Sequence, residues 1–323
     1  MTRALITGAA GQDGWYLAEL LAARGDEVHG VVRPASAPSV HDAVVRHDAD
    51  LSIPGSITAV VSRVDPDVVF NLAAVSSVPE SWTNPILTER MNAGVVVELL
   101  AVIRDRLEST GRSTRVIHAS SAEMFGNPER SPQDESTPIR PTSPYGAAKA
   151  YAHHLVGLYR AAGVEVSSCI LFNHESPRRP ERFVSRKIAL GVARIRAGMQ
   201  ETIELGNLDA KRDWGWAPDF ADALARVASS ETLDDYVVAT GVSHSVYDFA
   251  RSAFIHAGIS DWEDRVVSSR DLARPQDAVE QIGDASKIGA ALGWRPTVDF
   301  ADLVARMVDA DIARLSHPAD QIA

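Results

Sequence analysis

Residues 4–21 read ALITGAAGQDGWYLAELL, and this stretch decides the fold of the 323-residue chain. An apolar run typical of a buried strand ends at three glycines, Gly8, Gly11 and Gly14, and a helical pattern of apolar residues follows them. Glycine permits a tight turn and close approach of the backbone to a pyrophosphate, and the N–H groups at the start of a helix bind anions. The stretch therefore predicts a strand, a turn and a helix that bind a dinucleotide; a purely structural glycine-rich turn is the alternative.

The same alternation of strand and helix continues through the first half of the chain. Short apolar runs are separated by helical patterns near residues 54–64, 84–107 and 146–162. Repeated units of this kind predict an α/β fold built on a doubly wound parallel sheet. The apolar runs that we interpret as strands are residues 3–8, 27–32, 43–48, 67–74, 114–120, 164–172 and, later in the chain, 234–241.

The pattern becomes irregular after Asn173, where the Pro- and Arg-rich segment 176–183 interrupts it. A further helix is predicted near residues 184–198. Because no change in composition marks a linker, we expect a smaller substrate-binding domain that is interleaved with the first domain. The predicted dinucleotide-binding domain comprises residues 1–172 and about 209–245, and the predicted substrate-binding domain comprises about 173–208 and 246–318.

Composition narrows the class of protein. The net charge is −11, which argues against a general surface for nucleic acid or for anionic membranes. No apolar run approaches the roughly 18 residues of a membrane span, and the N-terminus turns glycine-rich too early for a signal peptide. Cys169 is the single cysteine, so no intramolecular disulfide can form. We expect a cytoplasmic protein without a metal site.

The glycine turn has the spacing Gly-x-x-Gly-x-x-Gly, with Gln12 and Asp13 inside it. The second strand is followed by Arg33, where an NAD site usually carries an acidic residue. A cation there suits a 2′-phosphate, so NADP is favoured over NAD; the alternative is a solvated loop residue. The predicted cofactor-binding residues are Gly8, Gly11, Gln12, Asp13, Gly14, Arg33, Asp50, Leu51, Ala73, Tyr145 and Lys149.

Tyr145 and Lys149 lie four residues apart in the segment SPYGAAKAY, residues 143–151. On a helix they share one face, and a neighbouring ammonium lowers the pKa of a phenol so that it can act as a base near neutrality. Ser121 ends a predicted strand, at the sheet edge where doubly wound folds bind ligands. A hydroxyl there can share a proton with Tyr145 across a substrate oxygen. A simple helix contact between Tyr145 and Lys149 is the alternative.

These features together resemble the extended short-chain dehydrogenase/reductase superfamily, which has a Rossmann fold. The resemblance implies that a tyrosine takes a proton from a sugar hydroxyl while hydride leaves the same carbon for the nicotinamide. Glu123, in SSAEMFG (residues 120–126), narrows the reaction. Oxidation at C4 of the sugar acidifies the C5 hydrogen, and a carboxylate at the strand end is placed to remove it. Loss of that proton expels the C6 hydroxyl as water. A carboxylate that caps the next turn is the alternative.

Four longer segments are very similar to GDP-mannose 4,6-dehydratases, and the similarity covers nearly the whole chain. They are residues 4–21, 171–187, 204–215 and 283–300. The similarity implies conversion of GDP-mannose, or of a related GDP-hexose or GDP-heptose, to the GDP-4-keto-6-deoxy sugar with bound NADP. It implies that the catalytic residues are Ser121, Glu123, Tyr145 and Lys149. It implies that the nucleotide sugar is contacted by Ser76, Asn173, Lys187, Arg212, Arg274 and Asp277.

The chain also departs from the pattern of this family. Val75 and Ser77 stand where the family more often carries Gln and His, and Trp216 replaces a usual His. These changes leave the identity of the sugar open. The segment after Arg33 is shorter than the arm that joins dimers into tetramers in the family, so we expect a homodimer, with a tetramer as the alternative.

Two other functions fit the same fold. An epimerase or reductase of nucleotide sugars needs no carboxylate at the position of Glu123. A non-catalytic protein that senses a dinucleotide needs neither Glu123 nor the Tyr145 and Lys149 pair. Because all three residues are present, the sequence favours the dehydratase.

Overall fold

The computed structural model describes residues 1–34, 39–269 and 280–316. Its largest element is a seven-stranded sheet with the order β10-β6-β5-β4-β1-β2-β3, in which every neighbouring pair is parallel. The order of the strands reverses between β1 and β4, and ligands bind at this point in open α/β sheets. The predicted doubly wound parallel sheet is thus confirmed. Its strands are β1 (Arg3–Thr7), β2 (Glu27–Val32), β3 (Val44–Asp48), β4 (Val68–Asn71), β5 (Arg115–Ser121), β6 (Val166–Leu171) and β10 (Asp235–Val238).

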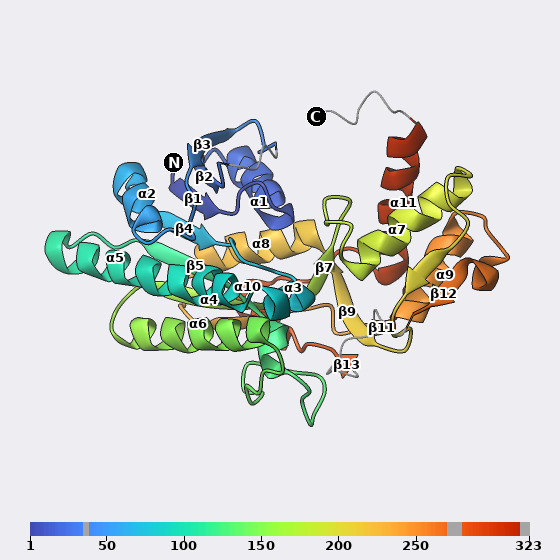
Figure 1. The fold of residues 1–323 in the computed structure, drawn as a ribbon. Helices are drawn as coiled ribbons and strands as arrows, with labels where there is room; N and C mark the ends of the chain where they lie inside the picture. The colour runs from blue at the N-terminus through green and yellow to red at the C-terminus, as the bar shows by residue number, and fades with distance from the viewer. Residues whose placement is uncertain (35–38, 270–279, 317–323) are drawn as a thin grey trace.

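Helices cover both faces of this sheet (Figure 1). Side chains alternate between the faces along a strand, so Ile6 packs in the core beneath α1 and α8, and Leu5 packs in the core beneath α2 and α5. The helices of the first face are α1 (Gln12–Ala23), α8 (Ala217–Ala228) and α10 (Ser286–Leu292). Those of the second face are α2 (Ser56–Val64), α3 (Val78–Thr83), α4 (Pro85–Glu89), α5 (Val95–Thr110) and α6 (Pro144–Ala161).

The single helix predicted near 84–107 is divided by a π-helical turn, η1 (Arg90–Gly94), between α4 and α5. This turn directs the buried side chain of Asn92 at the backbone of Val75. Asn92 Oδ1 accepts a hydrogen bond from Val75 N at 2.8 Å, and Asn92 Nδ2 donates to Val75 O at 2.9 Å. The turn therefore fixes the loop that follows β4 at the binding edge of the sheet.

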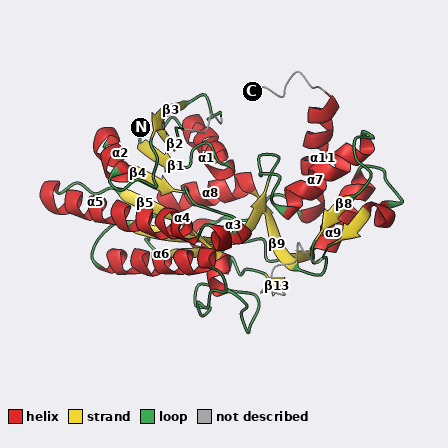
Figure 2. Cartoon of the chain, in the orientation of Figure 1, coloured by secondary structure: helices red, strands yellow, loops and turns green. Residues whose placement is uncertain are grey.

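A second region lies beside the large sheet, at the right of Figure 2. The four-stranded sheet of this second region lies on the side of the large sheet. Three helices of the region, α7, α9 and α11, pack around an apolar core of their own, which includes Phe249, Phe254 and Leu303. Its strands are β7 (Asn173–Glu175), β9 (Lys211–Trp216), β11 (Ser243–Ser245) and β13 (Glu280–Gln281), with a separate pair, β8 (Ile203–Leu205) and β12 (Val266–Ser268). Its helices are α7 (Val184–Arg196), α9 (Val246–His256), α11 (Phe300–Ser316) and the 3-10 turn η3 (Trp262–Arg265).

The interleaving of the two regions bears on the domain division. β9 pairs with β7, β11 and β13, not with the large sheet. Conversely, Ile288 and Trp294 pack in the core beneath α1 and α8. We therefore propose the predicted division with three changes: residues 211–216 and residues 243–245 join the smaller domain, and residues 285–294 join the larger one. Within the described ranges, no helix is long and apolar enough to cross a membrane.

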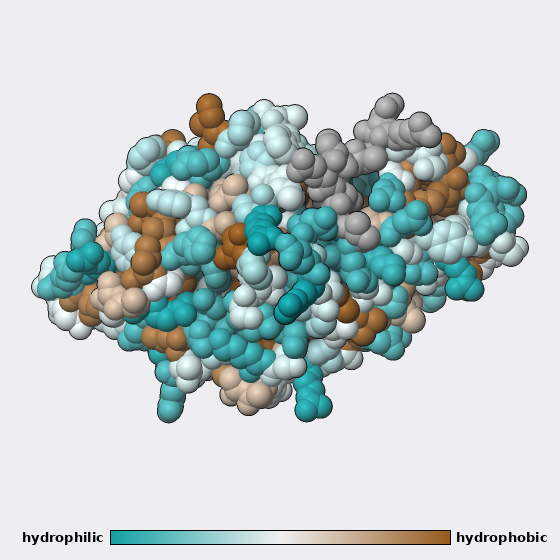
Figure 3. Space-filling model, turned by 90° about the horizontal axis from the view of Figure 1, so that it is seen from below, coloured by the Kyte–Doolittle hydropathy of each residue, from teal (hydrophilic) through white to brown (hydrophobic). Residues whose placement is uncertain are grey.

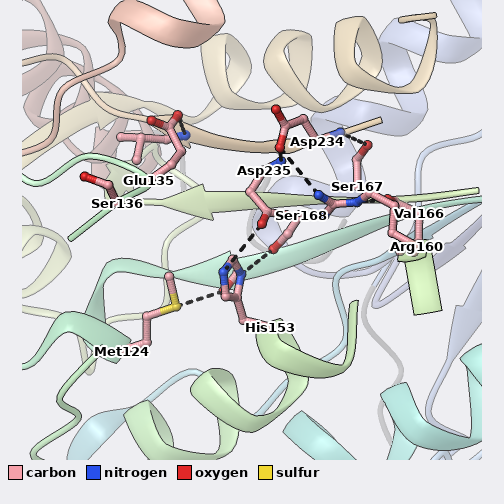
Figure 4. Close-up of polar contacts among 12 residues, drawn as sticks. Met124, Glu135, Ser136, His153, Arg160, Val166, Ser167, Ser168, Asp234 and Asp235 are labelled. Atoms are coloured by element: carbon pink, nitrogen blue, oxygen red, sulfur yellow. Dashed lines mark hydrogen bonds and ion pairs between the residues drawn. The ribbon is translucent and has the colours of Figure 1, made fainter. Parts of the chain in front are cut away.

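The outer strand β10 is joined to its neighbours by partly buried polar side chains (Figure 4). Arg160 of α6 forms an ion pair with Asp235 and donates to the carbonyl of Val166 at 2.8 Å. Glu135 accepts a hydrogen bond from the N–H of Val237 at 2.7 Å, and so pairs one donor of the exposed strand edge. Such pairing protects an edge strand against association with other chains.

Asp213 of β9 ties the two sheets together. The residue is fully buried, and its carboxylate accepts hydrogen bonds from the N–H groups of Thr240, Gly241 and Gly283, at 2.8, 2.9 and 3.2 Å, and from the Thr240 hydroxyl at 2.6 Å. Burial raises the pKa of Asp213 although these donors oppose the change. One carboxylate thereby fixes the chain after β10 and the chain after β13.

Asp213→Ala should lower the free energy of unfolding by about 3 kcal/mol or more, because each buried donor left without a partner costs about 1–3 kcal/mol. Urea unfolding followed by circular dichroism measures this change. Asp222→Ala is the control: Asp222 forms more exposed ion pairs with Arg24 and Arg226, and its loss should cost less than about 1 kcal/mol. Equal effects of the two variants would show that Asp213 is not a structural tie.

Candidate active site

The glycine turn between β1 and α1 is so tightly packed that only glycine fits. Gly8 has a φ of +73°, and a Cβ there would lie 3.1 Å from the backbone of Ala73. A Cβ on Gly14 would lie 2.4 Å from the carbonyl oxygen of Gly8. These close approaches leave the N-terminus of α1 open toward a cavity of about 610 Å³. A volume of this size and a glycine cradle suit a dinucleotide.

The cavity at the turn, here called the cofactor cavity, brings together the residues that the sequence predicted for it. Arg33 is exposed at the end of β2 and contributes to lowering the pKa of Asp50, although the hydrogen bonds that Asp50 accepts from Ser52 contribute more. Arg33 therefore lies near the rim. The predicted residues that line the cavity are Gly8, Gly11, Gln12, Asp13, Gly14, Arg33, Asp50, Leu51, Ala73 and Ser76.

A second cavity of about 160 Å³, here called the catalytic cavity, adjoins the first. The two share Asp13, Leu72, Ala74, Ser76, Arg179, Arg182 and Phe183 as lining residues. The catalytic cavity lies beyond the ends of β5 and β6, where the parallel strands of the large sheet point. The predicted residues that line it are Ser76, Ser121, Glu123, Tyr145, Lys149 and Asn173.

Local structure explains why the four candidate catalytic side chains converge. Ser121 ends β5 and caps the 3-10 turn η2 (Ala122–Phe125) by accepting a hydrogen bond from Glu123 N at 3.3 Å. Tyr145 lies in the first turn of α6, and a Cβ on the next residue, Gly146, would approach the carbonyl of Glu123 to 2.5 Å. The close packing of η2 on α6 thus places Ser121 and Glu123 beside Tyr145.

The hydrogen-bonding of Lys149 differs from the expected pattern. Its ammonium donates to the carbonyl oxygen of Ala119 at 2.6 Å. Burial lowers the pKa of Lys149 to about 8, against the opposing charge of Asp13. Burial raises the pKa of Tyr145 to about 12, although a hydrogen bond with Ser121 lowers it. The prediction that Lys149 lowers the pKa of the phenol is therefore wrong for this form of the protein, because desolvation is the largest effect.

An ion pair that the sequence did not predict joins the two cavities. His174 of β7 lies with Nε2 3.0 Å from Asp13 Oδ1, and its Nδ1 donates to the carbonyl of Phe172 at 2.7 Å. Burial by itself lowers the pKa of His174, but the charge and hydrogen bond of Asp13 raise it above its ordinary value. The neighbouring Gln12 donates to the carbonyl of His174 at 3.0 Å and accepts from the Ser176 hydroxyl at 2.8 Å. These contacts hold the glycine turn between β1 and α1 against β7.

The segment 176–183, interpreted from the sequence only as a break in the pattern, crosses between the cavities. Arg179 lines both, forms an ion pair with the buried Glu175 at 3.1 Å, and stacks on the ring of Phe183 at 3.8 Å. Arg178 stacks on the ring of Trp15 in α1 at 3.5 Å. The two adjacent arginines shortly after Asn173 were the available signal that this segment belongs to the site, since arginine suits the phosphates of a nucleotide.

The remaining predicted substrate contacts are not all brought together. Lys187 lies in the first turn of α7 and lines neither cavity. Arg212 is buried in β9, where it donates to the carbonyl of Lys211 at 2.7 Å, and it also lines neither cavity. Arg274 and Asp277 lie outside the described residues.

Comparison with known proteins agrees with this geometry. The sequence profile of the family described as GDP-mannose 4,6 dehydratase matches residues 5–307. The chain belongs to this family. It is 42% identical to GDP-mannose 4,6 dehydratase 2 of Arabidopsis thaliana over 96% of this chain and 86% of that protein. It is 36% identical to GDP-mannose 4,6-dehydratase of Vibrio cholerae over 96% of this chain and 94% of that protein.

Solved structures confirm the fold of this family member. The UDP-glucose 4-epimerase of Thermus thermophilus in complex with NAD superposes with a TM-score of 0.83 and is 27% identical. The alignment covers 96% of this chain and 98% of that chain. The extended short-chain dehydrogenase/reductase fold inferred from the sequence is therefore confirmed.

Proposed function

We propose that the protein converts GDP-mannose, or a closely related GDP-hexose or GDP-heptose, to the GDP-4-keto-6-deoxy sugar. Membership of the family makes the protein a hydro-lyase of nucleotide sugars. One observation carries the assignment: Ser121, Glu123 and Tyr145 line a single cavity that shares a wall with the cofactor cavity. An epimerase or a plain reductase has no step that uses the carboxylate of Glu123 in this place.

Tyr145 and Glu123 have different roles in the proposed reaction. Tyr145, hydrogen-bonded to Ser121, takes the proton from the C4 hydroxyl, and the charge of Arg179 favours the phenolate form. A nicotinamide dinucleotide held at the glycine turn of Gly8, Gly11 and Gly14 would supply the redox chemistry, as acceptor of the hydride from C4 and donor of hydride at C6. Glu123 removes the C5 proton, which the adjacent C4 ketone has acidified. It then passes this proton to the departing C6 hydroxyl, which leaves as water.

We propose NADP as the dinucleotide. The support is the position of Arg33 on the rim of the cofactor cavity, directly after β2 and beside Asp50. A guanidinium binds phosphate with two parallel hydrogen bonds, and the 2′-phosphate is the group that distinguishes NADP from NAD.

We propose that the protein is a dimer through α5 and α6, which pack together. Large apolar side chains are exposed on α6, Tyr151 at 52% and Leu158 at 65%, and on α3 and α4, which contact α6, Trp82 at 60% and Ile86 at 84%. Figure 3 looks at the molecule from below, the side on which α6 lies in Figure 1, and shows apolar side chains among hydrophilic ones over its left half. Burial of such a surface stabilises association.

Glu123→Gln tests the proposed reaction. The amide is nearly isosteric, so folding and cofactor binding should survive, and oxidation at C4 should proceed because Tyr145 and Ser121 are unchanged. Elimination should fall by roughly 10²–10⁴-fold, the usual contribution of a positioned general base. In a single turnover, absorbance at the wavelength of the reduced nicotinamide should rise and persist. If mass spectrometry showed dehydration within a few-fold of the wild-type rate, Glu123 would not be the base and would only stabilise the turn.

Arg33→Ala should weaken NADP far more than NAD, because only the 2′-phosphate loses a charge-assisted partner. Such a contact contributes about 1.5–3 kcal/mol, or roughly ten- to a hundredfold in affinity. Calorimetric titration of both dinucleotides gives the comparison. Equal losses for the two would mean that Arg33 does not contact the phosphate.

Leu158→Glu should convert the dimer to a monomer at micromolar concentration, because it places a charge within the proposed interface. Light scattering measures the mass. Ile255→Glu is the matched control, since Ile255 is 54% exposed on α9, away from this surface, and its substitution should leave the dimer intact. A stable tetramer in the wild type, or a dimer that survives Leu158→Glu, would require another surface.

A further inference from the structure

Gln281 has a side chain that the fold itself does not explain. It is 2% exposed, and neither its amide nitrogen nor its amide oxygen meets a hydrogen-bond partner within the described structure. Buried polar groups in folded proteins are almost always hydrogen-bonded, because an unpaired donor or acceptor has lost its water without replacement. An amide with two unpaired ends is a strong indication that a ligand completes its bonding.

The position of Gln281 identifies the ligand's site. Gln281 lines the catalytic cavity together with Phe172 and Asn173, and with the catalytic side chains. It lies in β13, where its register partner on β9 is Arg212. In Figure 1, β9 and β13 lie at the junction between the large sheet and the second region. The amide therefore lies where the smaller domain closes the cavity.

Neighbouring contacts hold the backbone of Gln281 in place. Gln133 accepts a hydrogen bond from Ile282 N at 3.0 Å and donates its own N–H to Ile282 O at 2.8 Å. Gly283 N donates to Asp213, and Ser243 donates to Glu280 at 2.6 Å. A side chain on so firmly held a strand cannot readily turn to water, so its unpaired amide is preorganised for a bound molecule.

We propose that the Gln281 carboxamide binds the hexose ring at its C2 and C3 hydroxyls and selects the configuration at C2. This inference rests on the proposed function. Ser121 and Tyr145 engage the C4 hydroxyl and Glu123 acts at C5 and C6, which leaves C2 and C3 without a protein partner among these residues. Gln281 lines the same cavity as Ser121, Glu123 and Tyr145, so the hydroxyls of C2 and C3 are the ring hydroxyls left for its carboxamide.

The chemistry of a carboxamide fits a pair of adjacent hydroxyls. Its NH₂ group donates to one oxygen while its carbonyl accepts from the other hydroxyl. Mannose and glucose differ only in the configuration at C2, so the same contact cannot be made equally well with both. A site built to hydrogen-bond a hydroxyl discriminates strongly, because the wrong substrate leaves buried polar groups unpaired.

Gln281→Leu separates this role from a structural one. Because the amide meets no hydrogen-bond partner among the described residues, its replacement by an apolar side chain of similar size should leave the melting temperature of the ligand-free protein unchanged or raise it. Gln133→Leu is the matched control, since Gln133 is as deeply buried but donates to Ser131 Oγ at 2.7 Å and accepts from Ile282 N. Gln133→Leu should lower the melting temperature.

Ligand binding by the same variant gives the second readout. Calorimetry should show that Gln281→Leu binds GDP as the wild type does, because GDP has no hexose. Its affinity for GDP-mannose should fall by roughly ten- to a hundredfold, the equivalent of two hydrogen bonds. The ratio of kcat/KM for GDP-mannose to that for GDP-glucose should fall with it, mainly through KM for GDP-mannose.

The outcomes distinguish this inference from the proposed function. If the wild type dehydrates GDP-mannose but Gln281→Leu keeps both its affinity and its sugar ratio, only the role of Gln281 is refuted. A melting temperature lowered as far as in Gln133→Leu would likewise refute it, because the amide would then have a partner in the fold. If the wild type dehydrates no GDP-sugar, the proposed function fails, and the role of Gln281 fails with it.

Discussion

The carboxylate of Asp13 and the imidazole of His174 meet 3.0 Å apart, partly buried between the two cavities, and this contact links the two regions at the site. Asp13 lies in the first turn of the first helix of the dinucleotide-binding region, and His174 lies on the strand by which the chain enters the second region. Each residue stabilises the charged form of the other. Burial raises the pKa of Asp13, but the charge of His174 lowers it below its ordinary value. The charge of Asp13 in turn raises the pKa of His174, against the effect of burial. A charged pair removed from water is costly to separate. The pair therefore fixes the glycine turn relative to Asn173 and the catalytic cavity.

Burial has a further consequence for the chemistry. Tyr145 and Lys149 are both nearly inaccessible to solvent, and desolvation moves their pKa values in opposite directions, to about 12 and about 8. Both changes favour the neutral form of each group. Ionisation of Tyr145 is helped by the hydrogen bond with Ser121 and by the charge of Arg179, which both lower the pKa of the phenol.

The sequence predicted the large sheet well because its strands are continuous apolar runs bounded by turn residues, as expected when both faces are buried. It also predicted that Ser121, Glu123, Tyr145 and Lys149 would converge, because parallel strands present their carboxyl ends at one edge. The pattern failed where strands are short: β7 and β13 have three and two residues, too few for any periodicity to be visible. His174 and Gln281 lie on these two strands, and both were missed.

The same short strands explain why the second region is interleaved with the first. The chain leaves the large sheet after β6 and returns at β10, and it passes through β7, α7, β8, β9 and α8 between them. It then crosses again through β13 before Trp294 packs in the first core. Two of these strands add a polar side chain to the lining of the catalytic cavity, His174 on β7 and Gln281 on β13. A domain attached by a single linker could move as a body and carry these groups away. Because the chain passes repeatedly between the two regions, and the four hydrogen bonds of Asp213 on β9 fix the chain after β10 and after β13, the wall of the cavity is held against the large sheet.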